Sequence, residues 1–201
     1  SPRSATHAAV ARRRPPFVPR VRQHHEDKAI EVWFQDEARF GQQGTLTNVW
    51  ADKGSRPQAV RQTEYDWCYL YAAVNPISGD SSAMLAPNVN TQFMNIHLKW
   101  ISEQAGPDKH MVLIVDGAGW HVSNNLVVPR NITLLPLPPY SPELNCLERV
   151  WAYLRSHDLS NRVYEDYDHL VDAGQLACNA LTPADLRSIR HTEWLTHEVQ
   201  G

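Results

Sequence analysis

The sequence predicts an α/β fold with a mixed five-stranded sheet, in which three antiparallel strands precede two parallel ones and helices flank the sheet. Three strand-like segments come early in the chain and are separated by turn residues, as in an antiparallel meander. A later apolar run, residues 110–116, does not alternate with polar side chains, which is typical of a parallel strand buried on both faces. Segments with helical periodicity separate and follow the strands, which completes an α/β order.

Each strand is predicted from an apolar, β-branched or aromatic run that ends at turn-forming residues. The first run, residues 29–36, is expected to end at Asp36. Residues 47–60 have the pattern of a hairpin that turns near Asp52–Gly54. A long strand is expected within residues 66–80, where Asn75, Pro76 and Gly79 turn into the next strand at 81–87, and two more strands are expected at 110–116 and 131–138.

Three helices are expected from apolar residues at helical spacing. The first covers residues 90–106 and ends at Gly106-Pro107. Its buried face is expected to hold Phe93, Ile96, His97, Trp100 and Ile101. The second helix starts with Ser141 as N-cap and Pro142 as its first residue. Its apolar stripe is expected to comprise Leu144, Leu147, Trp151 and Leu154. The third helix is amphipathic and covers residues 164–181.

Composition divides the chain into a basic arm or linker (residues 1–28), a globular domain (29–190) and a C-terminal tail (191–201). The prolines of RRRPPFVPR favour an extended backbone in the arm. The first 25 residues hold six arginines and no acid, which leaves 13 basic and 22 acidic residues in the rest of a chain of net charge −3. Such an arm suits either nucleic-acid contacts or a solvated linker, and the charge pattern leaves both open.

Several protein classes are disfavoured by composition. The longest apolar stretches are too short to span a membrane, and the N-terminus lacks the apolar segment of a secretory signal. The three cysteines are isolated from one another, which argues against a zinc ribbon and a disulfide framework. We therefore expect a cytoplasmic protein that does not bind membranes.

The stretch LIVDGAGWH places Asp116 directly after a buried strand. A β-hairpin that turns at Asp116-Gly117 fits poorly, because apolar and polar residues do not alternate in the preceding run. A dinucleotide-binding loop needs glycine where Val122 stands, and a Walker loop needs Gly-Lys-Ser/Thr. Asp116 is therefore predicted to be a functional carboxylate at the carboxyl end of a parallel strand, where α/β sheets bind ligands.

Two more acids complete a candidate site. Asp36 closes the first apolar strand, and Glu37 beside it is a competitor, because neighbours in a strand point to opposite faces and only one of the two can face the site. Glu148 borders an apolar helical stripe, where a carboxylate needs an ion pair, for example with Arg155, or a metal ion. Three carboxylates favour Mg²⁺ or Mn²⁺ over zinc, and two such ions could flank a phosphodiester.

Three motifs together resemble the DDE transposases, and most closely the mariner-like superfamily in its bacterial insertion-sequence branch. They are FQDEARFG with Asp36, LIVDGAGWH with Asp116 and LPPYSPELNCLERVW with Glu148. The 32 positions from Asp116 to Glu148 match the short spacing of that superfamily. The resemblance runs from about Glu31 to Leu186. It also includes Trp50, Lys53, Gly54 and Pro57.

The resemblance implies an RNase H-like catalytic domain over residues 29–190, with Asp36, Asp116 and Glu148 as catalytic residues and as ligands of two Mg²⁺ or Mn²⁺ ions. It implies that water cleaves DNA at the transposon ends and that the freed 3′-hydroxyl attacks target DNA, with a preference for the easily deformed TA step. The implied partners are double-stranded transposon-end and target DNA and a second copy of the chain. The implied location is the bacterial cytoplasm, at the nucleoid.

Further residues are candidate DNA contacts. His121 stands where many relatives have a histidine, although a packed or capping role is an alternative. Arg39 lies close to Asp36 in the sequence and is a candidate phosphate contact. The arm contributes Arg12, Arg13 and Arg14. By contrast, Trp120 is expected to lie in the core, and the pair His24-His25 is expected to be solvated.

The chain departs from the family pattern at two positions. Gly117 replaces an asparagine and Cys146 replaces a proline. Neither change removes a metal ligand, so we expect activity. Family members usually carry helix-turn-helix domains, so the chain resembles a catalytic domain alone, a truncated copy or one product of a split reading frame, with weak end recognition. Two alternatives stay open: an RNase H-like or resolvase-like nuclease, and a decayed transposase that only binds DNA.

Overall fold

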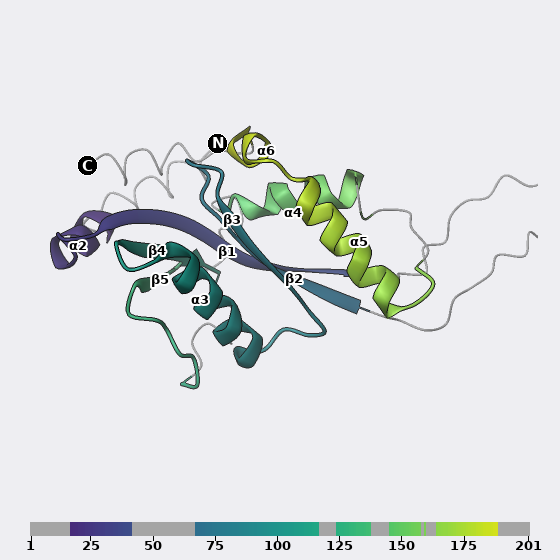
Figure 1. Cartoon of the computed structure of the whole chain (residues 1–201), viewed down its shortest axis with the longest axis horizontal. Coiled ribbons are helices and arrows are strands. Elements are labelled where there is room, and N and C mark those ends of the chain that lie inside the picture. The colour runs from purple at the N-terminus through teal and green to yellow at the C-terminus, as the bar shows by residue number, and fades with distance from the viewer. Residues whose placement is uncertain are drawn as a thin grey trace, which may run out of the picture.

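A five-stranded sheet with helices on both faces forms the centre of the computed structural model (Figure 1), which describes residues 17–41, 67–116, 124–137, 145–157, 159 and 164–188. The strand order is β3-β2-β1-β4-β5. β1 pairs antiparallel with β2, as β2 does with β3, whereas the β1–β4 and β4–β5 pairs are parallel. The predicted mixed sheet is therefore confirmed. The strands are β1 (Ala29–Gly41), β2 (Trp67–Val74), β3 (Ser81–Ala86), β4 (Lys109–Val115) and β5 (Ile132–Pro136).

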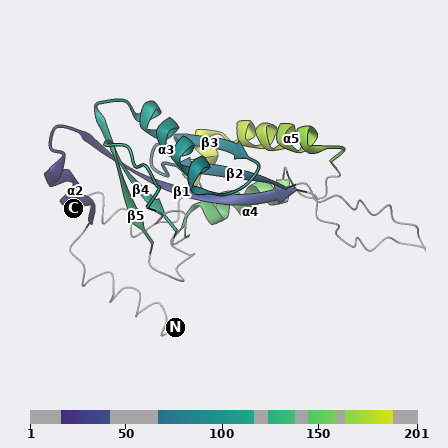
Figure 2. The same ribbon diagram turned by 90° about the horizontal axis from the view of Figure 1, so that it is seen from below.

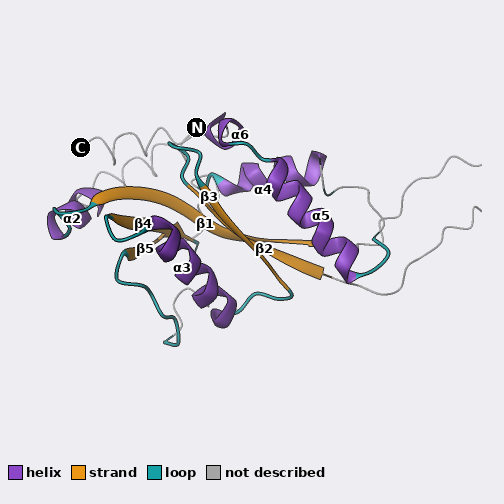
Figure 3. Ribbon diagram, viewed as in Figure 1, coloured by secondary structure: helices purple, strands orange, loops and turns teal. Residues whose placement is uncertain are grey.

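The helices cover the two faces of this sheet (Figure 3). Successive residues of β1 point to opposite faces, so Trp33 packs with the α3 side and Phe34 with the α4 and α5 side. Figure 2 shows α4 running along β1, the central strand. The helices are α2 (Phe17–His24), α3 (Thr91–Ala105), α4 (Leu147–His157), α5 (Tyr167–Ala180) and α6 (Pro183–Ser188).

One strand boundary differs from the prediction, and one predicted turn is confirmed. β1 does not end at Asp36 but continues to Gly41, because β2 supplies backbone partners from Val74, opposite Phe34, to Trp67, opposite Gly41. β2 ends at Val74, before the predicted turn residues Asn75, Pro76 and Gly79, and the Asn75 side chain accepts hydrogen bonds from the backbone amides of Ile77 and Ser78. The predicted hairpin over residues 47–60 lies outside the described residues.

The predicted extended arm contains a helix, α2, so an extended backbone is wrong for residues 17–24. Pro19 is the third residue of α2, within the first turn, where a missing backbone N–H is tolerated. Val18 and Val21 are buried and join the core on the α4 side. His25 is not simply solvated either, since its ring stacks at 3.7 Å between centroids on the buried ring of His110.

Helix α3 begins and ends as its sequence indicates, and four of the five residues of its predicted core face are buried or packed against the core. The Asn90 side chain caps its first turn through the Phe93 amide, and Gly106 ends it with φ +73°. Trp100 was expected to be buried and is 46% exposed. The buried residues are Met94, His97, Leu98 and Ile101, and this stripe leaves Trp100 on its solvent side.

Helix α4 starts later than predicted. Asn145 and Cys146 precede it, and Leu147 is its first residue, whereas the predicted N-cap Ser141 and first residue Pro142 lie outside the described residues. The Asn145 side-chain oxygen accepts a hydrogen bond from the Leu147 amide at 3.1 Å, which favours a helix that starts there. Residues 138–144 lie outside the described residues. Within the described part of the chain, no helix is long and apolar enough to cross a membrane.

Candidate active site

Asp36 and Asp116 occupy equivalent positions on two neighbouring parallel strands. The last paired residues of β1 and β4 are Gln35 and Val115, and each aspartate is the next residue along its chain. Asp36 therefore points to the same face as Phe34, which packs with α4 and α5. The charge on Asp116 is close enough to raise the pKa of Asp36. The sheet thus brings together two carboxylates that are 80 positions apart in the sequence.

Three N–H groups hold the buried Asp36 carboxylate, which is 8% exposed. The Glu37 backbone amide donates to Oδ1 at 2.8 Å. The Asn145 side-chain amide and the Trp151 indole each donate to Oδ2 at 2.9 Å. Asp36 is therefore fixed from its own strand and also from the start and first turns of α4.

Burial dominates the electrostatics of Asp36. It raises the pKa of this carboxyl from 3.8 to about 6, although the hydrogen bonds from Trp151 and the Glu37 amide lower it. The negative charges of Glu37 and Asp116 raise the pKa further. A cation beside these groups would offset both the lost hydration and the like-charge repulsion.

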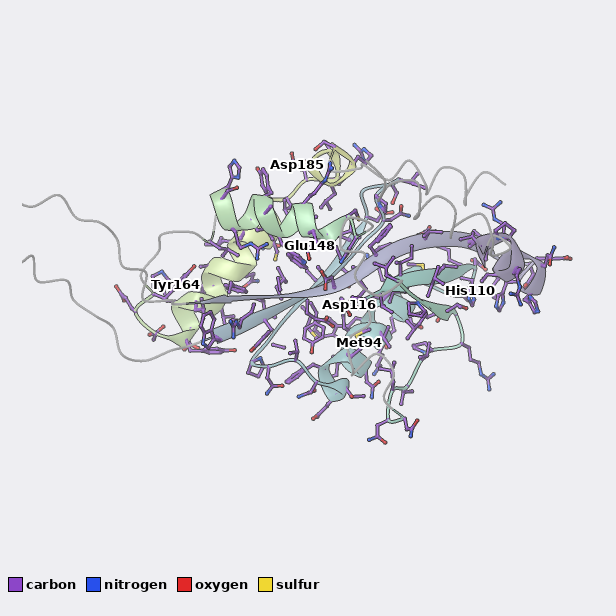
Figure 4. All side chains as sticks on the ribbon, turned by 180° about the vertical axis from the view of Figure 1, so that it is seen from behind. Met94, His110, Asp116, Glu148, Tyr164 and Asp185 are labelled. Atoms are coloured by element: carbon purple, nitrogen blue, oxygen red, sulfur yellow. The ribbon has the colours of Figure 1, made fainter. Side chains whose placement is uncertain are left out.

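Glu148 lies in the first turn of α4 and is exposed. Figure 4 shows it at the beginning of this helix, while Asp116 lies at the end of β4. Glu148 is three residues before Trp151, whose indole contacts Asp36. The sheet and α4 thus place all three predicted acids around one region of the molecule.

The expected convergence of the three acids on one point is absent from the described residues, where no three His, Cys, Asp or Glu side chains are placed to hold a metal ion. Residues 117–123 and 138–144, which adjoin Asp116 and the start of α4, lie outside the described part of the chain. The donor set nevertheless fits a divalent hard cation, because it consists of carboxylate oxygens. Asp36 and Asp116 are the pair best placed to begin such a site.

Other predicted residues fall into two groups. Glu37 points to the face opposite Asp36, as expected, and accepts a hydrogen bond from the Gln35 side chain at 3.0 Å. Arg39 lies on that same opposite face, with its guanidinium 4.1 Å from the centroid of the Trp67 ring, so its DNA contact stays a prediction. The structure describes none of Arg12, Arg13, Arg14, Gly117, Trp120 and His121.

Cys146, at the position where the family pattern has proline, is buried beside the site. Burial raises the pKa of its thiol to about 12, and the charge on Asp36 acts in the same direction. The thiol is therefore protonated at neutral pH, and Cys146 serves as an apolar packing residue.

Sequence reasoning missed the polar roles of Asn145 and Trp151. It assigned Trp151 to an apolar stripe, and the residue is indeed 4% exposed. A buried indole N–H needs a hydrogen-bond acceptor. The sequence therefore indicates that Trp151 has a partner but does not identify it. The partner, Asp36, is 115 positions away in the sequence, so only the fold identifies it.

Comparison with known proteins agrees with this geometry. Residues 31–171 match the family model described as "DDE superfamily endonuclease". An uncharacterized protein, y4pE/y4sA of Sinorhizobium fredii, is 44% identical over 130 residues, which is 64% of this chain and 96% of that protein.

Solved structures show the same fold at low sequence identity. The Mos1 transposase paired-end complex with left transposon end gives a TM-score of 0.61 at 16% identity, over 90% of this chain and 58% of that one. The catalytic domain of Mos1 mariner transposase gives 0.54 at 14% identity, over 91% of this chain and 86% of that one. The chain thus spans a little more than half of the Mos1 chain in the paired-end complex. On the family match and this shared fold, the chain belongs to the DDE superfamily of endonucleases and has the catalytic-domain fold of a mariner-like transposase.

Proposed function

We propose that this chain cleaves DNA at transposon ends and transfers the resulting 3′-hydroxyl end into target DNA, in a reaction that depends on divalent metal ions. The observation that carries the proposal is that Asp36 and Asp116 each follow the last residue of the parallel β1–β4 pairing, on the face covered by the helix of Glu148. Membership of an endonuclease family supports phosphodiester chemistry at this site.

Asp36, Asp116 and Glu148 would hold two Mg²⁺ or Mn²⁺ ions. When bound, such ions activate the attacking oxygen and stabilise the leaving oxygen of a phosphodiester. The chain itself contributes two aspartates, each directly after the last residue of the parallel β1–β4 pairing. It also contributes Glu148, whose side chain is exposed on the first turn of α4 and is therefore accessible from solvent.

The proposed reaction has two balanced steps. In the first, a water oxygen bonds to phosphorus and the bond from phosphorus to the 3′-oxygen breaks, which leaves a 3′-hydroxyl and a 5′-phosphate. In the second, that 3′-oxygen bonds to a target phosphorus and displaces the 3′-oxygen of the target strand. In each step the attacking group loses its proton and the leaving oxygen gains one.

Double-stranded transposon-end and target DNA are the proposed substrates, with TA steps as targets. A second copy of the chain is proposed to join on the DNA, and such substrates would place the protein at the bacterial nucleoid. Two Mos1 complexes of similar fold, the paired-end complex with left transposon end and the strand transfer complex, support this choice of substrate.

A strand-joining assay tests the proposal. The full chain is incubated in Mn²⁺ with supercoiled plasmid and a labelled duplex that carries the element's terminal sequence and a free 3′-hydroxyl. Wild type should join the label to the plasmid, and Asp116→Asn should not. Asp108→Asn is the matched control, because Asp108 is exposed at the opposite end of β4, and it should join normally.

Three results would contradict the proposal. Joining by Asp116→Asn would remove that residue from the chemistry. Preferred cleavage of an RNA–DNA hybrid would indicate an RNase H-like nuclease. A folded wild-type chain that neither binds Mn²⁺ nor joins DNA would indicate a domain that only binds DNA.

A further inference from the structure

We infer that Asn145 and Trp151 are positioning residues, which hold one oxygen of Asp36 and leave the other oxygen for a cation. This inference rests on the proposed metal-dependent function, and it adds two neutral side chains to the three acids. It assigns a specific task to each oxygen of the Asp36 carboxylate.

The hydrogen bonds on Asp36 are divided unequally between its two oxygens. Oδ2 accepts two side-chain donors, the Trp151 indole and the Asn145 amide, each at 2.9 Å. A carboxylate oxygen has two lone pairs, so these donors saturate Oδ2. Among the described residues, Oδ1 accepts one donor, the Glu37 backbone amide at 2.8 Å. Oδ1 is therefore the oxygen with a lone pair available to a cation.

The same two residues also fix helix α4 against the sheet. Asn145 donates to Asp36 with its amide nitrogen and accepts from the Leu147 amide, the first residue of α4, with its amide oxygen. Trp151 lies about one turn after Glu148 and donates to the same Asp36 oxygen. The start of α4, with Glu148, is thus tied at two points to the carboxylate of β1.

Burial makes these hydrogen bonds to Asp36 difficult for water to replace. Asp36, Asn145 and Trp151 are all buried, so water does not readily replace a lost donor. Partners that donate to a metal-binding carboxylate orient it, and their removal typically lowers metal affinity about 10–100-fold. In the inferred role, the N–H of Trp151 orients the Asp36 carboxylate, and the packing of the Trp151 ring is a separate contribution to stability.

The test compares two indole N–H groups that make the same kind of bond. Trp151→Phe removes the bond to Asp36, and Trp33→Phe removes a bond of 2.9 Å from the Trp33 indole to the Glu31 carboxylate. Both tryptophans are buried, at 4% and 3% exposure. Trp33 packs on the opposite face of the sheet, so its change should leave Asp36 in place.

Mn²⁺ affinity of the full chain is measured by calorimetry, and stability by urea unfolding. Both variants should lose stability. Trp151→Phe should also bind Mn²⁺ about 10–100-fold more weakly, whereas Trp33→Phe should bind it as wild type does. Equal Mn²⁺ affinity in the two variants would overturn the inference, because the Trp151 N–H would then contribute to stability alone.

A second variant covers the case in which Trp151→Phe does not fold. Asn145→Ser keeps an oxygen that can cap α4 but loses the amide donor to Asp36. It should weaken Mn²⁺ binding as well, and unchanged affinity would overturn the role of Asn145. A folded wild type that binds no Mn²⁺ refutes the proposed function together with the inference. If wild type binds Mn²⁺, Asp116→Asn does not, and Trp151→Phe binds normally, the proposed function stands and only the inference fails.

Discussion

Replacing His97 should remove a large acid sensitivity from the stability of this protein. His97 is fully buried on α3, where it packs edge-on against Tyr71 with 5.9 Å between ring centroids. Burial lowers the pKa of His97 from 6.5 to about 4. The Ser82 backbone and the charge on Glu37 act in the opposite direction, although neither ring nitrogen makes a hydrogen bond of good geometry with any described residue.

The magnitude follows from this shift in the pKa of His97. A shift of about 2.5 pKa units corresponds to about 3 kcal/mol. Between pH 6.5 and 4 the unfolded chain binds a proton that the folded chain excludes. The contribution of the shifted His97 pKa to the free energy of unfolding is therefore complete above pH 6.5 and is lost as the pH falls towards 4.

Urea unfolding from pH 7.5 to 4 measures the effect for wild type and His97→Leu. Relative to the variant, wild type should lose about 3 kcal/mol over this range. His24→Leu, at an exposed histidine of α2, is the control and should follow wild type. A constant difference between wild type and His97→Leu across the range would refute the reasoning, because the buried ring would then not exclude its proton.

Three further predictions concern backbone, site and metal. Gly79→Ala should lower stability in thermal unfolding more than Gly106→Ala does. Both glycines have positive φ, which costs alanine about 1–3 kcal/mol. Of the two, only Gly79 is placed so that an added Cβ would clash with the backbone of Pro183. Equal losses would contradict this. Glu148→Gln should abolish strand joining and change the unfolding free energy by less than about 0.5 kcal/mol, since Glu148 is exposed. The control Glu165→Gln, at another exposed glutamate, should keep strand joining. An active Glu148→Gln variant would exclude Glu148 from the catalytic residues. EDTA should stop strand joining without changing the circular dichroism spectrum, because paired strands and a buried apolar core hold the sheet together. A loss of the folded signal in EDTA would show that the metal has a structural role.

The sheet could be predicted because its signals are local. Apolar runs and turn residues locate β1, β2, β3, β4 and β5, and the lack of alternation in β4 marks it as a parallel strand. These local signals do not determine that β4 pairs with β1, which only the structure shows. The family resemblance identified Asp36 and Asp116, which the structure brings together just after the last pair of the parallel β1–β4 ladder.

The errors arise where distant contacts decide the local structure. β1 extends past Asp36 because β2 pairs with polar residues whose own propensity for strands is low. Helix α2 forms where Pro19 falls in a first turn and two valines reach the core. The start of α4 depends on the side chain of Asn145, which also contacts Asp36 across 109 positions. No local pattern contains that information.

A crystal structure of the full chain with Mn²⁺ tests the central claim most directly. We predict an anomalous peak with Asp36 Oδ1 and an Asp116 carboxylate oxygen within roughly 2.0–2.6 Å, and with Asp36 Oδ2 still bound to Asn145 and Trp151. Glu148 should complete the site with one of its carboxylate oxygens. A well-ordered site in which Mn²⁺ is absent from these carboxylates, or bound elsewhere on the chain, would contradict the claim.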